Sequence, residues 1–563
     1  EIAASLEVLG LPVLYLGSLF EREEIKDLLS LLSLVTDRRA TGLVRAATLP
    51  GYTVRLEHIT ALQQHLREAD PAPLGWKALV DEVPGLDEQA RENLKRLSAV
   101  LGDVPTNANP WSVLASLVID RLGWAKQAVM ANDLQGQMKG IALWQLLNFA
   151  RNPINSSGLP IDRLLSRIRR IVLLSEDREM RQLPQAAHSI NGVRLMTIHA
   201  SKGLEFKVVH LPGMIATGLP GSNRPPRCVP PDGLIDGTEG LTGLEAIKAG
   251  HEEEEECKFF VATSRAQNEL LLYAYSVQND GKNRSRSKYI DRIASVIQQQ
   301  NNPTRLSLQP VEPEVLSLDD KALLISEKQL SLYDRCPRRF LYTHALALAG
   351  KRTESAFMQM HSAVYGVLDW LGQQHSESTP SAGEVEAQFT LSWLNRGPVD
   401  HGYADDYRRI GERLVQYLIE TRQGRQMVKP EVLQVSFPEG EISVLPDEMT
   451  LDTDGKYSIR RIKSGKKGSE EFDRIEYTLL LEAAERQFGH GTRVEAVHLA
   501  GETQEQVTVT DRKKSARLSK TQSAMAAIAQ GHFPAKPENR TCPRCPSFFI
   551  CGKVPAGKIG IKK

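Results

Sequence analysis

Hydrophobic and polar positions follow different patterns along the chain. Residues 10–17 form a short apolar run between glycines, which predicts a strand, and residues 20–35 carry Leu and Ile at helical spacing behind early acidic positions. Residues 38–190 then contain successive segments of helical periodicity, and no strand signal interrupts them for long. Residues 191–300 return to short apolar runs separated by polar turns. This order predicts an α/β domain that is interrupted by a helical insertion.

The length of 563 residues is too great for one hydrophobic core, so we expect about two to four domains. Two polar stretches, residues 276–288 and 298–305, mark the end of the α/β part, and another domain follows them. The predicted domains are residues 1–37 together with 191–305, residues 38–190, and residues 310–563.

Composition and charge narrow the function classes. The net charge of +1 gives no global basic field, so any contact with nucleic acid must come from local patches. No apolar run reaches about 18 residues, so we expect no membrane span. Six cysteines in 563 residues do not suggest a secreted disulfide framework. The chain opens at Glu1 without an initiator Met or a signal-peptide pattern, and we expect a fragment that begins inside a folded domain.

Two stretches place charged groups at the ends of apolar segments. Residues 193–206, VRLMTIHASKGLEF, predict a strand that ends in a polar turn. Residues 252–266, EEEEECKFFVATSRA, predict an acidic run, a buried FFVA strand and then Arg265. Parallel α/β sheets place nucleotide chemistry at such strand ends. The polar turn contributes Thr197, His199, Lys202, Gly203 and Glu205.

The two stretches resemble motifs V and VI of the UvrD/Rep-type superfamily 1 DNA helicases. The resemblance implies a RecA-like second motor domain, and residues 38–190 resemble its inserted helical subdomain. It implies that Gly203 and Glu205 approach the nucleotide and that Arg265 is the catalytic arginine finger, which stabilises charge on the transferred phosphoryl group. Two blander interpretations stay open: an ordinary polar turn, and an Arg265 that pairs with the acidic run.

The same resemblance implies that Thr197, His199 and Lys202 face the phosphates of DNA. The sequence departs from the family pattern at Glu256, Cys257 and Lys258, where an arginine pair usually precedes the apolar segment.

No GxxxxGK[ST] phosphate loop and no DExx strand end occur in residues 1–563. The chain therefore carries half of an ATPase site. We expect a first motor domain upstream in the same polypeptide, which would bind ATP and Mg²⁺ together with this one.

The C-terminal stretch TCPRCPSFFIC contains three closely spaced cysteines, and a fourth lies far upstream in SLYDRCPRRFLY. Four thiolates suit zinc or an iron–sulfur cluster, and free thiols are the remaining possibility. The split spacing resembles the iron-staple nuclease domain of AddB-type recombination nucleases, which implies a [4Fe-4S] cluster, with zinc as the alternative. The implied ligands are Cys336, Cys542, Cys545 and Cys551.

The resemblance to RecB/AddB-type nuclease folds implies a metal site built from an Asp and a later (Asp/Glu)-x-Lys. Asp447 and Lys463 fit the first acid and the lysine, but Arg461 stands where the second acid belongs. An arginine close to a divalent ion would repel it, and Mg²⁺ needs carboxylate ligands. We therefore expect a degenerate nuclease site that does not cleave. The alternative is an active site with a displaced acid, Asp452 or Asp454.

Other features of the nuclease pattern are also incomplete. The family's Gln-x-x-x-Tyr falls on Tyr477 and Leu481, and our preferred register places Tyr365, not His361, at the histidine position. A cluster of basic residues between positions 460 and 467 suits the phosphate backbone of a DNA strand. The alternative is that these residues form a solvated edge of a hairpin. Its members are Arg460, Arg461, Lys463, Lys466 and Lys467.

The predicted fold is an α/β multidomain protein. A RecA-like second motor domain with a helical insertion precedes an α/β restriction-endonuclease-like domain stapled by four cysteines. The resemblance implies a translocase that moves 3′ to 5′ on single-stranded or tailed DNA and acts in repair, recombination or defence. It also implies a cytoplasmic, bacterial-type, nucleoid-associated location and allows for a partner subunit. Two alternatives remain: a non-enzymatic DNA-binding scaffold within a helicase-nuclease complex and an active magnesium-dependent helicase-nuclease.

Overall fold

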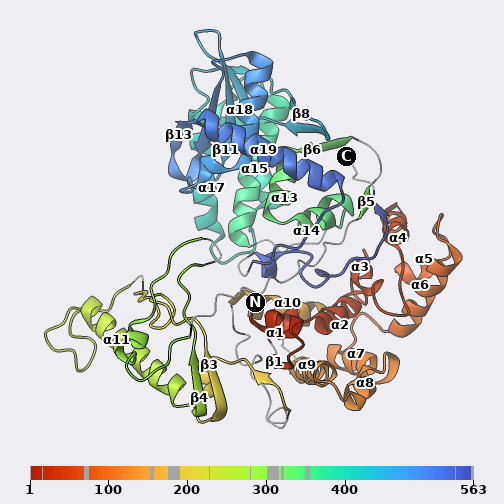
Figure 1. The fold of residues 1–563 in the computed structure, drawn as a ribbon. Coiled ribbons are helices and arrows are strands. Elements are labelled where there is room, and N and C mark those ends of the chain that lie inside the picture. Colours follow the sequence, from red (N-terminus) through yellow and green to blue (C-terminus); the bar gives the residue numbers. More distant parts are fainter. Residues whose placement is uncertain are drawn as a thin grey trace. The chain divides into compact units, whose positions relative to one another are not determined.

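The chain folds into two compact units (Figure 1). The first comprises residues 1–19, 127–142 and 178–310, and the second comprises residues 20–126, 143–177 and 311–563. The computed structural model describes residues 2–15, 17–68, 75–152, 157–174, 176, 180, 190–226, 228–278, 281–300, 316–318, 322–348, 355–538 and 541–559.

These units divide the chain differently from the sequence pattern. Residues 20–37, which we expected in the motor domain, belong to the second unit. The reason is the helix α2 (Glu23–Ser33), whose buried leucines pack against neighbouring helices of the helical region. Most of that helical region in turn shares a compact unit with residues 311–563.

The first unit contains two pairs of parallel strands. β1 (Val13–Leu14) pairs with β2 (Val193–Arg194), and β3 (Phe206–Leu211) pairs with β4 (Ala266–Leu272). A small core beside β3 and β4 includes Leu211, Met214, Ala262 and Tyr289. Among the described residues, the α-helices that lie wholly within this unit are α1 (Ile2–Val8), α11 (Gly243–Thr263) and α12 (Lys288–Arg292).

The predicted FFVA strand is wrong, because residues 259–262 lie inside the helix α11. A capping box starts this helix: the Thr242 side chain accepts from the backbone N–H of Glu245, and the Glu245 carboxylate accepts in return. Once started, the helix carries the apolar quartet as its final turn. Only part of the quartet meets the core, since Ala262 is buried but Phe260 is 70% exposed.

The helical region of the second unit confirms the helical periodicity of the sequence. Its core is built largely from leucines on the inward faces of the helices, although α8 (Trp124–Met130) contributes no buried residue. The helices are α2, α3 (Leu43–Ala46), α4 (Leu56–Glu68), α5 (Trp76–Leu79), α6 (Glu88–Leu101), α7 (Pro110–Ser116), α8 (Trp124–Met130), α9 (Leu134–Arg151) and α10 (Pro160–Leu174). The boundary between the two units falls within α8 and α9. Among the described helices, none combines the length and apolar character that crossing a bilayer requires.

The rest of the second unit is built on a five-stranded sheet in the order β13-β12-β11-β10-β7. Its strands are β7 (Gln426–Val428), β10 (Glu448–Leu451), β11 (Tyr457–Lys463), β12 (Arg493–His498) and β13 (Thr503–Gln506). β11 and β12 are parallel, and the other neighbours are antiparallel. A three-stranded sheet lies beside it in the order β6 (Leu323–Ser326), β9 (Gly440–Val444), β8 (Leu433–Phe437).

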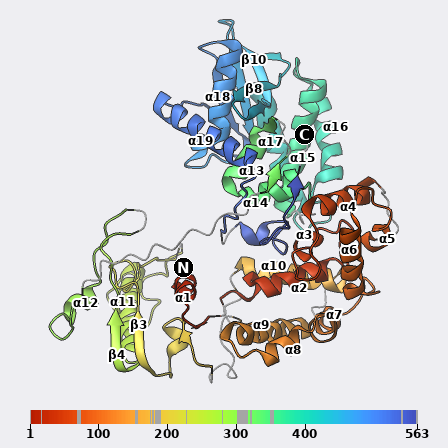
Figure 2. The same cartoon turned by 45° about the vertical axis from the view of Figure 1, so that its right-hand side comes forward.

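Helices cover both faces of these strands. Figure 2 shows α18 (Ile475–Phe488) and α19 (Asp511–Ala529) on one side and α15 (Ala356–Gln374) and α16 (Ala382–Arg396) on the other. α17 (Ala404–Glu420) packs with α15 and α16 around Ile462 of β11. Two short helices, α13 (Glu327–Arg335) and α14 (Pro337–Phe340), follow β6.

The segment of residues 541–559, which carries three cysteines, is held to the helical region by two arginines. Arg45 is fully buried and donates to the Asp27 carboxylate at 2.6 Å and to the Cys551 carbonyl oxygen at 2.8 Å. Arg169 donates to the carbonyl oxygens of Cys545 and Pro546 at 2.7 and 2.9 Å. These guanidinium groups satisfy carbonyls of an irregular segment that has little secondary structure of its own.

We expect Arg45→Met to lower the free energy of unfolding of the second unit by about 3–5 kcal/mol, because the half-buried Asp27 carboxylate loses its partner. Denaturant unfolding of the full chain measures this, and faster alkylation of Cys551 reports release of the C-terminal segment. Arg38→Met is the control, since the Arg38 side chain is exposed. Equal stability of the two variants would show that Arg45 does not hold the segment.

Candidate functional site

The predicted nucleotide turn lies between β2 and β3. Thr197, His199, Lys202 and Glu205 are exposed there, and a short 3₁₀ turn spans His199–Ser201. Gly203 has φ = 82°, a conformation that side chains other than glycine rarely adopt. The turn therefore presents its polar groups to solvent from a backbone that glycine makes accessible.

Arg265 connects α11 to β4 and lies against this turn. Its Nη1 donates to the Leu204 carbonyl oxygen at 2.9 Å, and its Nε donates to the Val261 carbonyl oxygen at 2.9 Å. Its Nη2 donates to the Ser264 hydroxyl at 2.9 Å. Next to it, Gln267 donates to the Glu205 carboxylate at 3.1 Å. The structure thus places Arg265 beside the turn that carries Glu205.

The pairing of Arg265 with the acidic run is not observed. Among the described residues, the partners of that run are Lys258, which pairs with Glu254 and Glu255, and Arg292, which pairs with Glu256. The three hydrogen-bond acceptors of Arg265 are all uncharged, so its positive charge is not neutralised by them.

In the second unit, Asp447 and Arg461 face each other across the start of the β10–β11 hairpin. The Asp447 carboxylate accepts from the Ile462 N–H at 2.8 Å and lies 3.5 Å from Arg461 Nη1. Arg461 Nη2 lies 3.1 Å from the Glu327 carboxylate at the start of α13. Lys463 Nζ lies 3.7 Å from the Glu476 carboxylate on α18. We call these five residues the carboxylate–arginine cluster.

Two members of this cluster, Glu327 and Glu476, escaped the sequence prediction. Glu327 follows the end of an apolar strand and starts a helix with a capping box. This pattern indicates a polar residue at a strand end, but it does not reveal that the partner is Arg461, 134 residues away. Burial raises the pKa of Glu327, and the charge of Arg461 opposes that rise. Burial also acts on Glu476, but a hydrogen bond from Ser331 and the charge of Lys463 outweigh it and lower its pKa.

The alternative acids do not belong to the cluster. Asp452 and Asp454 lie at the turn between β10 and β11, at the opposite end of the hairpin from Asp447, and pair with Arg493 at 3.0 and 3.4 Å. Their position at the far end of the hairpin therefore does not support the alternative in which Asp452 or Asp454 replaces the missing acid of the nuclease site.

The residues expected at the remaining nuclease motifs have other surroundings. Tyr477 is buried and donates to the Glu471 carboxylate at 3.1 Å, while Leu481 lies further along α18. The Tyr365 hydroxyl accepts from the Ser464 N–H at 3.4 Å, which places Tyr365 close to the end of β11. Burial lowers the pKa of His361, one turn earlier on α15.

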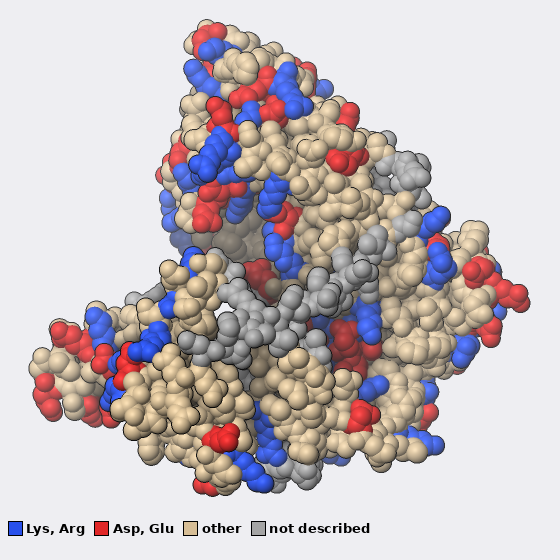
Figure 3. Space-filling view, in the orientation of Figure 1, with Lys and Arg blue, Asp and Glu red and all other residues tan. Residues whose placement is uncertain are grey.

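Most residues of the basic cluster that was predicted to bind DNA are buried or paired with carboxylates. Arg460 is fully buried and bonded to Glu448, and Arg461 is 5% exposed and committed to carboxylates. Lys467 pairs with Glu505, which leaves Lys466 exposed and Lys463 half-buried. Arg461 is therefore unsuited to bind a DNA backbone, because its guanidinium lies inside the domain. Figure 3 shows basic and acidic side chains intermixed over the face it draws.

The cluster does not fit the divalent cation that nuclease folds of this kind use. In the part of the chain that the structure describes, no group of three or more His, Cys, Asp or Glu side chains is placed to hold a metal ion. The guanidinium of Arg461 stands between the two carboxylates, Asp447 and Glu327, that would supply oxygen ligands.

The same finding applies to the four cysteines, so the expected metal centre is not supported as a preformed site among the described residues. Cys336, Cys542, Cys545 and Cys551 are free thiols of intermediate exposure. Burial raises the pKa of the Cys545 thiol, and the charges of Cys336 and Cys542 add to the rise. Burial raises the pKa of Cys551 to about 11, with further contributions from Cys545 and Cys336. The four sulfur atoms thus lie near enough to influence one another.

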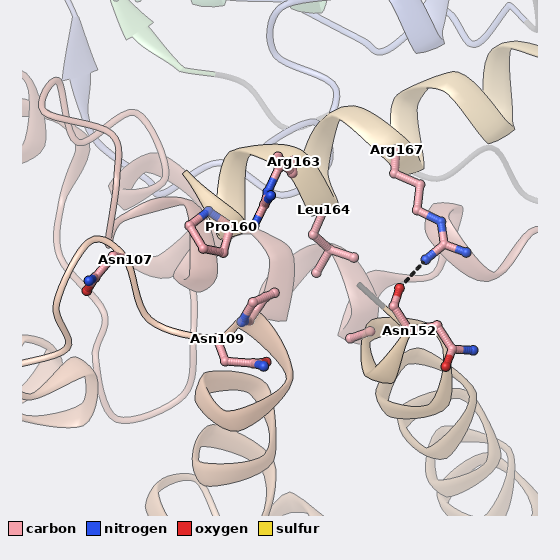
Figure 4. A pocket seen from close by; sticks show the side chains of 9 residues that line it. Asn107, Asn109, Asn152, Pro160, Arg163, Leu164 and Arg167 are labelled. Carbon is pink, nitrogen blue, oxygen red and sulfur yellow. Dashed lines mark hydrogen bonds between the residues drawn. The ribbon is translucent and has the colours of Figure 1, made fainter. Parts of the chain in front are cut away.

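A cavity of about 250 Å³ lies in the helical region, between the ends of α7, α9 and α10 (Figure 4). Arg163, Arg167 and Asn109 line it, and Arg167 donates to the Asn152 carbonyl oxygen at 2.7 Å. The cavity does not include any residue of the sites described above.

Comparisons with known proteins agree with both halves of this description. Residues 87–277 match the UvrD-like helicase C-terminal domain, and residues 324–552 match the PD-(D/E)XK nuclease superfamily. An ATP-dependent helicase/nuclease protein from Leuconostoc mesenteroides is 26% identical over 305 residues, which is 51% of this chain. The chain spans about a quarter of that relative's length, since the match covers 24% of it. Two successive regions of the chain are therefore similar to the UvrD-like helicase C-terminal domain and to the PD-(D/E)XK nuclease superfamily.

Proposed function

We propose that this chain is the C-terminal part of an ATP-dependent translocase that moves 3′ to 5′ on single-stranded DNA. In this proposal its nuclease-like region binds DNA or a partner subunit without cleaving. The observation that carries the proposal is the position of Arg265 beside the turn of Gly203 and Glu205, in a region that matches the UvrD-like helicase C-terminal domain.

The hydrogen bonds of Arg265 suit an arginine finger. Two backbone carbonyls and a hydroxyl fix its guanidinium without neutralising its charge. Among the described residues, no carboxylate forms an ion pair with it, so the charge remains available to a phosphoryl group. An arginine fixed in advance stabilises transition-state charge without reorganisation at the moment of reaction.

The exposed side chains of the same turn supply the contacts to DNA. Thr197, His199 and Lys202 point hydroxyl, imidazole and ammonium groups into solvent, and such groups bind phosphate oxygens. Glu205 is exposed on the same turn and is the proposed contact to the ribose. ATP and Mg²⁺ need a phosphate loop that residues 1–563 do not contain, so another domain supplies it.

For the C-terminal segment we propose a [4Fe-4S] cluster held by Cys336, Cys542, Cys545 and Cys551. The support is their split spacing together with the mutual effect of the thiols on their pKa values. When bound, the cluster would tie α13 to the C-terminal segment.

A non-enzymatic scaffold is the second candidate function. The observation that favours it is Arg461, whose guanidinium lies at the position of the second acid and pairs with Glu327 and Asp447. A scaffold predicts that Arg265 contributes only its three hydrogen bonds to the fold. A motor predicts that Arg265 matters for hydrolysis far more than for stability.

In the polypeptide that also carries the phosphate-loop domain, we expect Arg265→Ala to reduce DNA-stimulated ATP hydrolysis by about 10³–10⁵-fold. Nucleotide binding, measured by equilibrium fluorescence titration, should persist because the phosphate loop and Glu205 remain. Arg292→Ala is the matched control, an exposed arginine of the same unit that pairs with Glu256. Hydrolysis that survives in Arg265→Ala at the control level would favour the scaffold.

We expect the anaerobically purified chain to contain iron and sulfide and to absorb visible light as iron–sulfur proteins do. In that form Cys336, Cys542, Cys545 and Cys551 should resist alkylation, while Cys228 and Cys257 react because they are exposed and outside the cluster. After iron removal, Cys551 should react slowly below its pKa of about 11, since the thiolate is the nucleophile. Stoichiometric zinc without iron, or equal reactivity of all six thiols in the purified chain, would disprove the cluster.

A further inference from the structure

Arg461 occupies an unusual place for an arginine. It lies on β11, 5% exposed, with one nitrogen 3.5 Å from the Asp447 carboxylate and the other 3.1 Å from the Glu327 carboxylate. The nitrogen nearer Asp447 also donates to the Leu445 carbonyl oxygen at 3.1 Å. One guanidinium thus joins the start of β10, the strand β11 and the first residue of α13.

The charges around Arg461 explain why a cation is needed at this place. Asp447, Glu327 and Glu476 bring three negative charges, and Lys463 and Arg461 bring two positive charges. The Lys463 ammonium is closest to Glu476, so Asp447 and Glu327 depend on Arg461. Placing the Asp447 and Glu327 carboxylates around the same buried guanidinium position would cost free energy if no cation lay between them.

We propose that the Arg461 guanidinium takes the place of the divalent cation in this nuclease-like domain and makes its fold independent of metal. The inference deepens the proposal that the domain does not cleave DNA, because the position that a metal would need is filled by the chain itself. It also implies that a neutral residue at 461 opens a latent divalent-cation site between Asp447 and Glu327. Mg²⁺ and Mn²⁺ accept one or two carboxylates with water completing their shell.

The opposite face of the sheet supplies a comparison. Successive residues of a strand point to opposite faces, so Arg460 faces the α15–α17 side, as Ile462 does. There Arg460 and the fully buried Arg422 share one carboxylate, Glu448. With the neighbouring pair of Arg425 and Glu495, that face has three guanidinium groups for two carboxylates, whereas the Arg461 face has two carboxylates for one guanidinium. Removing an arginine should create a cation site only on the Arg461 face.

The experiment uses the full chain and Mn²⁺ as the only probe. Wild type, Arg461→Met, Arg461→Gln and the control Arg422→Met are compared by thermal unfolding in EDTA and in Mn²⁺, and by calorimetric titration with Mn²⁺. We expect the wild type to unfold at the same temperature in both solutions. Arg461→Met and Arg461→Gln should unfold earlier in EDTA, recover in Mn²⁺ and bind one further equivalent of Mn²⁺. Arg422→Met should unfold earlier in both solutions.

A second substitution identifies the ligands. Adding Glu327→Gln to Arg461→Gln should abolish the gain of Mn²⁺ binding, which also separates this site from the cysteines. Mn²⁺-dependent stability of the wild type that Glu327→Gln removes would overturn the proposal, and so would Arg461 variants that fold but ignore Mn²⁺. If both Arg461 variants fail to fold in EDTA, their folding when Mn²⁺ is present supports the proposal, and failure in both solutions overturns it. DNA cleavage by the wild type would instead refute the proposed function, whatever the Mn²⁺ titrations show.

Discussion

The fold of the second unit depends on arginines that leave water together with their counter-charges. Burying a charge costs several kcal/mol, and the structure persists only where partners of opposite charge or aligned carbonyls offset that cost. Arg45, Arg422, Arg460 and Arg461 all meet this condition. Some of their partners are far away in the sequence, 134 residues for Arg461 with Glu327 and 506 residues for Arg45 with the Cys551 carbonyl, whereas Arg460 pairs with Glu448 only 12 residues away. Arg45 and Arg461 therefore fix long-range connections that apolar packing alone would specify less strictly.

Much of the fold could be predicted from local patterns. Helical spacing identified α2 and the helices of the insertion, and the polar turn of Gly203 and Glu205 emerged from residues that are neighbours in sequence. The strand prediction for the FFVA segment is wrong for a local reason. Its apolar run matches a strand, but the capping box at Thr242, about five turns upstream, starts a helix that continues through the segment.

The partners of Arg461 could not be predicted in the same way. The departure at position 461 is visible in the sequence, because an arginine stands where the nuclease pattern has an acidic residue. Its consequence was not visible, because Glu327 comes from a separate helix and Asp447 from the neighbouring strand. The sequence predicts Arg461 as a surface cation for DNA, but both faces of β11 are covered, so the residues of the strand from 458 to 462 are buried whichever face they point to.

The chemistry of an arginine is set by the charge of its partners more than by its depth. Arg265 and Arg461 each make hydrogen bonds through several nitrogens, so both are fixed in position. The acceptors of Arg265 are two carbonyls and a hydroxyl, which orient the guanidinium without neutralising its charge, as the proposed arginine finger requires. The nearest acidic partners of Arg461 are two carboxylates, which consume its charge within the domain. This difference in partners is what allows the same side chain to be proposed as an arginine finger in one unit and as a replacement for a metal ion in the other.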